Sequence, residues 1–179
     1  MTRGTLFLVV GPSGAGKDTL IRAAQAALGA DEPVVFARRV ITRRAADPAE
    51  DFDSVRRDDF AARKAAGGFM LAWRAHGTDY GIPARYADDL AAGRSVVANV
   101  SRGAVADAAQ HFAPVRVVEV TASPSVLARR LAVRGREDEA AIAERLRRAV
   151  KLPEGVPTIR IVNDGALDDA IRAFVAALR

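Results

Sequence analysis

The amino-acid sequence predicts an α/β fold in which helices flank a mostly parallel sheet, and two observations carry this prediction. Runs rich in β-branched residues alternate with longer stretches of helical spacing, which is typical of βαβ units. The first run, Leu6–Val10, leads directly into the glycine-rich segment Gly11–Thr19 and then into an Ala- and Leu-rich helical pattern. Strand, glycine-rich loop and helix in this order predict the P-loop NTPase version of the fold.

The remaining elements follow from the same two patterns, taken in chain order. The strand-like runs are Leu6–Val10, Val34–Val40, Phe69–Arg74, Val96–Val100, Val115–Val120 and Thr158–Val162. The helical patterns are Asp18–Leu28, Asp58–Ala66, Ala84–Ala92, Gly103–Gln110, Ser123–Val133, Glu139–Val150 and Leu167–Leu178. Gly29 and Gly93 stand where helices are expected to end, and Ser123-Pro124 combines an N-cap with proline at the first helical position.

Length and composition limit the class of protein. With 179 residues, 50% of them hydrophobic, residues 1–179 are expected to form a single domain. No apolar run approaches the ~20 residues that span a membrane, and no signal peptide is expected. The sequence has no cysteine, which excludes disulfides and thiol chemistry. We expect a cytoplasmic protein that acts as a monomer or a homodimer.

The glycine-rich loop is the strongest functional signal in the chain. Its glycines let successive backbone N–H groups point toward phosphate oxygens, and the helix that follows adds its positive dipole end. Lys17 can then reach the β- and γ-phosphates as a compact ammonium, in a chain whose other basic residues are nearly all arginine. We therefore expect ATP to bind the nine loop residues Gly11, Pro12, Ser13, Gly14, Ala15, Gly16, Lys17, Asp18 and Thr19.

Asp18 stands where the usual loop pattern has Ser or Thr, whose hydroxyl binds Mg²⁺. A carboxylate is also a hard oxygen ligand that suits Mg²⁺, either directly or through water. Asp18 is therefore the candidate metal ligand. The simpler alternative is an acidic residue that stabilises a helix N-terminus.

The charge of the chain indicates an anionic substrate. The net charge is +5, and 24 of the 27 basic residues are arginine. Only 6% of the residues are aromatic, so stacking platforms for single-stranded nucleic acid are scarce. We expect a phosphorylated small molecule, with no nucleic acid and no membrane as partner.

Two segments interrupt the regular alternation of strands and helices. Residues 38–86 begin with a cluster of arginines around Thr42 and are expected to form an inserted region that binds the phosphoryl acceptor, because arginines grip phosphate oxygens in pairs. Residues 129–139 are expected to form a small lid. For the arginine cluster, a solvated charged loop is the alternative.

The order of these motifs resembles that of the guanylate kinase family over nearly the whole chain. The resemblance implies a parallel sheet core with a region that binds the phosphoryl acceptor, a nucleoside monophosphate in that family, and with an arginine-bearing lid. It implies that Arg39, Arg43 and Tyr80 hold the acceptor phosphate and that Asn163 lies near the adenine. It also implies that the lid arginines Arg130, Arg134 and Arg136 close over the transferred phosphoryl group.

The sequence departs from guanylate kinases at the positions that bind the guanine base. Leu71 aligns with their glutamate, and Val97–Ser101 carries no carboxylate. A site without such hydrogen-bond partners discriminates poorly for guanine. The chain is more similar to the ribose 1,5-bisphosphate phosphokinase branch. The shared segments are Gly11–Asp18, Arg39–Arg43, Trp73–Gly81, Asn99–Arg102, Arg134–Glu137 and Asn163–Gly165.

This closer resemblance implies transfer of the ATP γ-phosphoryl group to ribose 1,5-bisphosphate, with 5-phosphoribosyl 1-diphosphate as the product, in phosphonate breakdown and the supply of nucleotide and NAD precursors. Asn99 and Ser101 are candidates for bonding ribose hydroxyls, Arg102 for the 5-phosphate, and Thr42 lies within the acceptor motif. The alternative enzyme is a guanylate kinase or another nucleoside monophosphate kinase. A non-catalytic interaction module and a nucleic-acid-binding P-loop protein are further alternatives.

Overall fold

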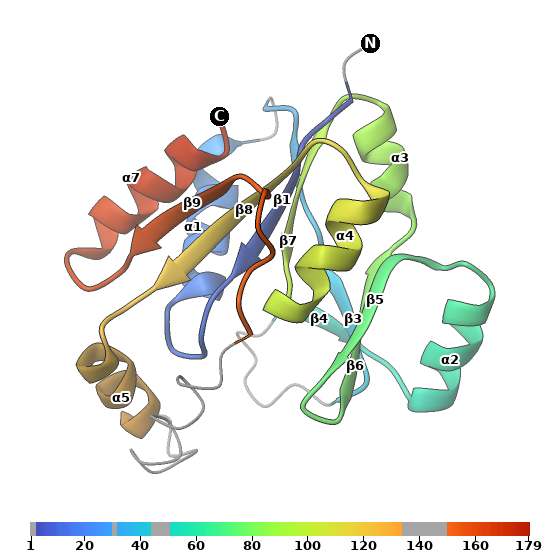
Figure 1. Cartoon of the computed structure of the whole chain (residues 1–179), viewed down its shortest axis with the longest axis horizontal. Coiled ribbons are helices and arrows are strands. Elements are labelled where there is room, and N and C mark those ends of the chain that lie inside the picture. Colours follow the sequence, from blue (N-terminus) through green and yellow to red (C-terminus); the bar gives the residue numbers. More distant parts are fainter. Residues whose placement is uncertain (1–2, 30–31, 44–50, 134–149) are drawn as a thin grey trace.

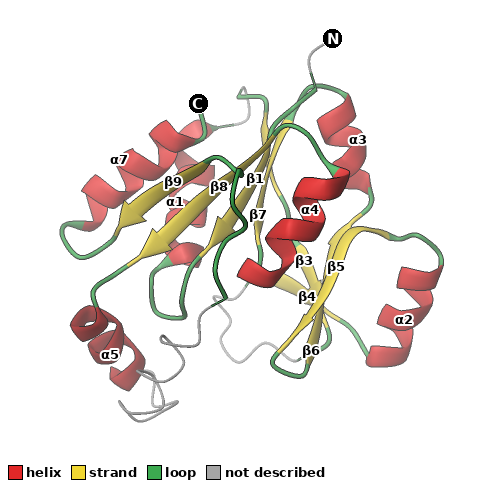
Figure 2. Cartoon of the chain, in the orientation of Figure 1, coloured by secondary structure: helices red, strands yellow, loops and turns green. Residues whose placement is uncertain are grey.

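The computed structural model describes residues 3–29, 32–43, 51–133 and 150–179. Its centre is a five-stranded sheet in the order β2-β7-β1-β8-β9, in which every pairing is parallel. The strands are β1 (Leu6–Val10), β2 (Val34–Phe36), β7 (Ser95–Asn99), β8 (Val115–Thr121) and β9 (Thr158–Val162). The predicted α/β class and its parallel sheet are confirmed (Figure 2).

Strand β1 occupies the middle of this sheet and fixes what surrounds the loop after it. Val9 pairs with Asn99 of β7, and Val10 pairs with Glu119 of β8. Because the strands are parallel, their carboxyl ends meet at one edge, which is where ligands bind in open α/β sheets. The chain therefore leaves β1 into the glycine-rich loop with polar residues of two other strands on either side.

Helices cover both faces of the five-stranded sheet, and each face has its own core. Helices α1 (Lys17–Leu28) and α7 (Leu167–Ala177) bury Leu20 and Phe174 against one face. Helices α3 (Arg85–Ala91) and α4 (Val105–His111) bury Leu90 and Val105 against the other. Helices lie on either side of the five-stranded sheet (Figure 1). All five residues of β1 are buried, which explains why its sequence is continuously apolar rather than alternating.

A second sheet of four strands, in the order β4-β3-β6-β5, lies within the inserted region. Its strands are β3 (Arg39–Ile41), β4 (Phe52–Ser54), β5 (Phe69–Ala75) and β6 (Thr78–Pro83), and helix α2 (Arg57–Ala65) lies outside it. The predicted single strand Val34–Val40 is therefore wrong, because the chain leaves one sheet after Phe36 and enters the other at Arg39. The sequence also predicted one strand here and not four.

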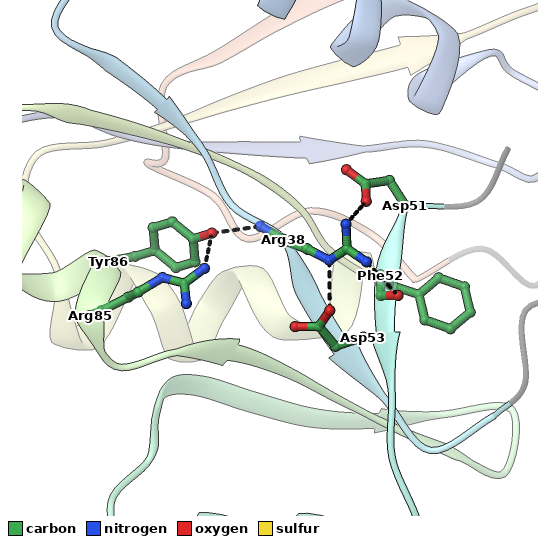
Figure 3. Close-up of polar contacts among 6 residues, drawn as sticks. All are labelled: Arg38, Asp51, Phe52, Asp53, Arg85 and Tyr86. Atoms are coloured by element: carbon green, nitrogen blue, oxygen red, sulfur yellow. Dashed lines mark hydrogen bonds and ion pairs between the residues drawn. The ribbon is translucent and has the colours of Figure 1, made fainter. Parts of the chain in front are cut away.

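Arg38 lies at the joint between the two sheets, as Figure 3 shows. Its backbone N–H donates to the Tyr86 hydroxyl of α3 at 2.9 Å. Its guanidinium binds Asp53 at 2.7 Å, pairs with Asp51 and donates to the Phe52 carbonyl. The hydrogen bond to Asp53 raises the pKa of Arg38. The joint is thus held to the core by its backbone and to β4 by its side chain.

Two further elements belong to the described chain. The 3-10 helix η1 (Arg102–Ala104) follows β7, and α5 (Pro124–Val133) follows β8 at the loop edge of the sheet. The helix predicted over Glu139–Val150 lies almost entirely outside the described residues, as do residues 134–139 of the predicted lid. In the described part of the chain, no helix has the length and apolar character that crossing a membrane requires.

Candidate active site at the carboxyl edge of the sheet

The loop between β1 and α1 adopts backbone conformations that glycine enters far more readily than other residues. Gly11, Gly14 and Gly16 have φ values of 147°, 83° and 92°, which L side chains rarely adopt. Lys17 folds back over the loop, where its ammonium donates to the carbonyl oxygens of Gly11 at 2.8 Å and Pro12 at 3.0 Å. Its positive charge therefore lies against the loop, where the sequence predicts that the phosphates bind.

The loop rests on two side chains from distant parts of the chain. Asn163 is buried after β9, and its amide donates to the Ala15 carbonyl at 2.8 Å. Arg130 of α5 donates to the Gly14 carbonyl at 3.3 Å and to the Asn163 carbonyl at 2.9 Å. Asn163 therefore supports the loop, and its contact with adenine stays a prediction. Arg130 brings a positive charge beside the loop.

Asp18, in the first turn of α1, connects the loop to strands β7 and β3. Its carboxylate accepts a hydrogen bond from the Asn99 amide at 2.8 Å, and the Arg39 guanidinium lies 3.9 Å away. Asp18 has a side chain that is 58% exposed, whereas that of Arg39 is 17% exposed. Three residues predicted from separate motifs are thus brought together at one point.

Most of the other predicted residues lie on or beside the four-stranded sheet β4-β3-β6-β5, which we name the acceptor sheet after its predicted role. Arg43 lies over the Phe52 ring at 4.9 Å, and the Thr42 hydroxyl accepts a hydrogen bond from the Asp79 backbone at 2.9 Å. Thr42 thus joins β3 to β6. Two further contacts orient the aromatic residues: Tyr80 stacks on Trp73 at 5.3 Å, and the Trp73 indole donates to the Ser101 hydroxyl at 2.9 Å. The substrate contacts of Thr42, Arg43, Tyr80 and Ser101 stay predictions.

Glu119 is a site residue that the sequence interpretation missed. It is 7% exposed, and its carboxylate accepts hydrogen bonds from Arg102 at 3.1 Å and Arg160 at 2.7 Å. Burial alone raises the pKa of Glu119, but the hydrogen bonds from Arg160 and Arg102 outweigh it and the net pKa is lowered. A lone acid in the apolar strand Val115–Val120 is the signal that could have found it. Arg102 donates to Glu119, and its predicted contact with the 5-phosphate stays a prediction.

Replacing Glu119 by glutamine is expected to lower the free energy of unfolding at neutral pH by about 1–3 kcal/mol, since two arginines lose a buried counter-charge. A lowered folded-state pKa stabilises the protein above the unfolded-state pKa, and this contribution is lost as the pH falls through the folded value. The difference between wild type and Glu119→Gln is therefore expected to shrink as the pH falls below the ordinary range of glutamate pKa values. Denaturant titration at neutral pH and below that range measures it. Glu154→Gln, at an exposed position, is the control, and equal differences at both pH values would contradict the assignment.

Asp18 is the residue that the sequence predicts to bind Mg²⁺. Among the residues that the structure describes, no group of three His, Cys, Asp or Glu side chains could hold a metal ion. Mg²⁺ usually binds through one or two carboxylates together with substrate phosphates and water, so an exposed aspartate beside the loop lysine fits it. When bound, Mg²⁺ neutralises charge on the phosphates.

Taken together, the loop, its lysine and the parallel sheet define a P-loop nucleotide-binding protein. The structure gathers the loop residues, Asp18, Arg39, Asn99, Arg130 and Asn163 around one edge. Arg134 and Arg136 lie outside the described residues.

Comparison with known proteins extends this assignment. A family model described as "AAA domain" matches residues 6–152. Ribose 1,5-bisphosphate phosphokinase PhnN of Acidiphilium cryptum is 51% identical over 98% of this chain and 92% of its own length. The protein of the same name from Methylobacterium radiotolerans is 50% identical over 98% of both chains. The chain therefore belongs to the ribose 1,5-bisphosphate phosphokinase family.

Other relatives are longer. A bifunctional ribose 1,5-bisphosphokinase-thymidine phosphorylase of Cupriavidus pinatubonensis is 49% identical over 98% of this chain, which spans 29% of that protein. Among solved structures, guanylate kinase from Anaplasma phagocytophilum matches with a TM-score of 0.72 at 20% identity, covering 99% of this chain and 86% of the other. That likeness supports the fold predicted by resemblance to guanylate kinases.

Proposed function

We propose that this protein transfers the γ-phosphoryl group of ATP to the C1 phosphate of ribose 1,5-bisphosphate, forming 5-phosphoribosyl 1-diphosphate and ADP. The observation that carries the proposal is the contact of Asp18 with Asn99 and Arg39. This contact brings the phosphate loop of the core against an arginine of the acceptor sheet, so two anionic substrates can meet between them. The acceptor is the one in the names of the relatives that are about 50% identical to this chain.

The reaction requires positioning and charge neutralisation more than acid–base chemistry. An oxygen of the C1 phosphate attacks the γ-phosphorus and forms the new P–O bond. The bond from the γ-phosphorus to the bridging oxygen breaks, and that oxygen leaves with ADP. The acceptor oxygen is already largely ionised at neutral pH, because the second pKa of a phosphate monoester is about 6. A protein base is therefore not needed.

The site residues have distinct roles in this proposal. The loop N–H groups and Lys17 hold the β- and γ-phosphates of ATP. Arg43 and Tyr80, on the acceptor sheet, orient the C1 phosphate for attack. Arg130, already beside the loop at Gly14, offsets negative charge that spreads over the transferred group, with Arg134 and Arg136 as further lid arginines. Excluding water protects the γ-phosphoryl group from hydrolysis.

Asp18 is proposed to support Mg²⁺ at the phosphates. Asp18→Asn keeps the size of the side chain and its bond to Asn99 but removes the charge, so we expect the Mg²⁺ concentration for half-maximal activity to rise about 10-fold or more. Mg²⁺ titrations of initial rate measure it. The matched control is Asp58→Asn, because Asp58 is an acidic residue in the first turn of α2. An unchanged Mg²⁺ dependence in Asp18→Asn would leave Asp18 with only a helix-terminal role.

The acceptor is tested by competition between two substrates. Leu71 is 4% exposed and packs in the core of the α3 and α4 face, so it offers no hydrogen-bond acceptor to guanine. With ATP and Mg²⁺, kcat/KM for ribose 1,5-bisphosphate is therefore expected to exceed that for GMP by orders of magnitude. The reverse preference would establish a guanylate kinase. The proposal includes a cytoplasmic location. It also includes a monomeric or homodimeric state, and analytical ultracentrifugation can distinguish these two states.

A further inference from the structure

Trp73 contacts two residues that come from different parts of the fold and that the sequence predicts to bind the acceptor. Its ring stacks on Tyr80, the residue opposite it on β6, with the ring centroids 5.3 Å apart and the planes 8° from parallel. Its indole N–H donates to the Ser101 hydroxyl at 2.9 Å. Because Ser101 lies between β7 and η1, Trp73 joins the acceptor sheet to the core at this point.

The packing around Trp73 fixes the direction of its indole N–H. Trp73 lies two residues after Leu71 on β5, so both side chains stand on the same face of the acceptor sheet. Leu71 and its partner Ile82 are buried in the core of the α3 and α4 face, and Trp73 packs against the same core. A large ring that packs against a core and stacks on Tyr80 cannot rotate without losing contacts.

Ser101 is held from the other side by its neighbours in the sequence. Arg102, the next residue, donates to the buried carboxylate of Glu119 on β8 at 3.1 Å. The backbone carbonyl of Ser101 accepts a hydrogen bond from the Ala104 N–H at 2.9 Å. The core thus fixes the main chain at Ser101, and the direction of the hydroxyl proton is what stays adjustable.

The bond from Trp73 decides how the Ser101 hydroxyl can be used. An indole N–H is a donor only, so the Ser101 oxygen accepts in this bond. A serine hydroxyl also carries a proton of its own, and in the described part of the chain the bond from Trp73 is the only side-chain contact of Ser101. The proton is therefore available to an oxygen that comes from outside the chain. Phosphate and sugar oxygens accept hydrogen bonds of this kind.

We propose that Trp73 is a positioning residue for the phosphoryl acceptor, because its indole N–H orients the Ser101 hydroxyl as a donor to an oxygen of the bound sugar phosphate. The inference rests on the proposed function and deepens it, since it gives a role to a residue that does not itself have to touch the substrate. Ser101→Ala removes the donor, whereas Trp73→Phe removes only the group that orients it. Phenylalanine keeps an aromatic ring that can stack on Tyr80.

The test compares the two single variants with the double variant. Each single variant is expected to raise KM for ribose 1,5-bisphosphate about 10-fold, as expected for losing one hydrogen bond, while KM for ATP stays unchanged. The double variant is expected to match Ser101→Ala, because the indole has nothing left to orient once the hydroxyl is gone. Multiplied losses in the double variant would show that the two residues act independently and would overturn the proposal. An equal rise in both KM values would overturn it as well, since a general loss of structure would explain it.

A binding measurement distinguishes failure of the positioning role from failure of the proposed function. Trp73 is the only tryptophan in the sequence, so intrinsic fluorescence reports on it alone, and a titration with ribose 1,5-bisphosphate without ATP requires no turnover. We expect a saturable change in emission whose apparent Kd is about 10-fold higher in Ser101→Ala than in wild type. The matched control is Ser95→Ala, which removes a hydroxyl that accepts from the Thr5 N–H at the opposite end of β7 and is expected to keep the wild-type Kd.

The outcomes of this titration separate the two claims. If ribose 1,5-bisphosphate binds with the expected loss in Ser101→Ala but is not phosphorylated when ATP and Mg²⁺ are added, the positioning role stands and the proposed function falls. If the Kd is the same in Ser101→Ala and wild type, or if the emission of Trp73 does not respond to ribose 1,5-bisphosphate, the positioning role falls.

Discussion

Lys17→Ala is expected to lower kcat by about 10²- to 10³-fold, because the variant loses the ammonium that lies over the phosphate loop. In the structure this group donates to the carbonyl oxygens of Gly11 and Pro12, so it is held where the β- and γ-phosphates are expected. A charge that is fixed in advance stabilises the transition state without reorganising during the reaction. The free energy of unfolding is expected to change little, since Lys17 is only half-buried.

The composition of the chain provides a matched control for this experiment. Lysine occurs only at positions 17, 64 and 151, and Lys64 lies exposed in the last turn of α2. Lys64→Ala removes the same charge from a surface position and is expected to keep kcat. Initial rates with ATP and ribose 1,5-bisphosphate measure both variants. Equal kcat values in the two variants would show that Lys17 does not contribute to catalysis.

Gly11→Ala is expected to be the most damaging small substitution in the loop. A Cβ on Gly11 would lie 1.9 Å from the Val120 carbonyl oxygen, which is a backbone atom of the neighbouring strand β8. Gly11 also has a φ of 147°, which a residue with a Cβ rarely adopts. Either β1 and β8 separate or the loop moves, so we expect the free energy of unfolding to fall by about 4 kcal/mol or more. Denaturant titration measures this loss.

Gly29→Ala separates the steric clash from the cost of backbone conformation. Gly29 also has a positive φ, 67°, but a Cβ there would meet nothing within 4 Å. With a ψ of −173°, Gly29 occupies a backbone region that residues with a Cβ rarely enter, so this variant is expected to lose about 1–3 kcal/mol. A similar loss in Gly11→Ala would show that the loop can leave β8 at little cost.

The part of the fold that the sequence predicted best is the part set by local pattern. Continuous apolar runs with β-branched residues located the strands of the parallel sheet, and glycine and proline located helix ends. The four-stranded sheet was missed because its short strands β3 and β4 have three residues each and depend on partners far away in the chain. Three residues carry too little periodicity to distinguish a strand from a loop.

The candidate site likewise combines residues that a local motif predicts with residues that only the folded chain brings together. The loop motif predicted the phosphate site because nine consecutive residues contain it. The contact of Asp18 with Asn99 spans 81 positions, and the bond from Asn163 to Ala15 spans 148, so neither could be read from spacing. Glu119 was overlooked because its importance comes from burial between two arginines, which only the folded chain shows.

Phosphorus NMR of the reaction mixture shows most directly which phosphate receives the group from ATP. With ribose 1,5-bisphosphate, ATP and Mg²⁺, we predict that the C1-phosphate resonance is replaced by two mutually coupled diphosphate resonances. The 5-phosphate resonance is predicted to persist while ADP accumulates. Unchanged sugar resonances beside an active conversion of GMP to GDP would contradict the account.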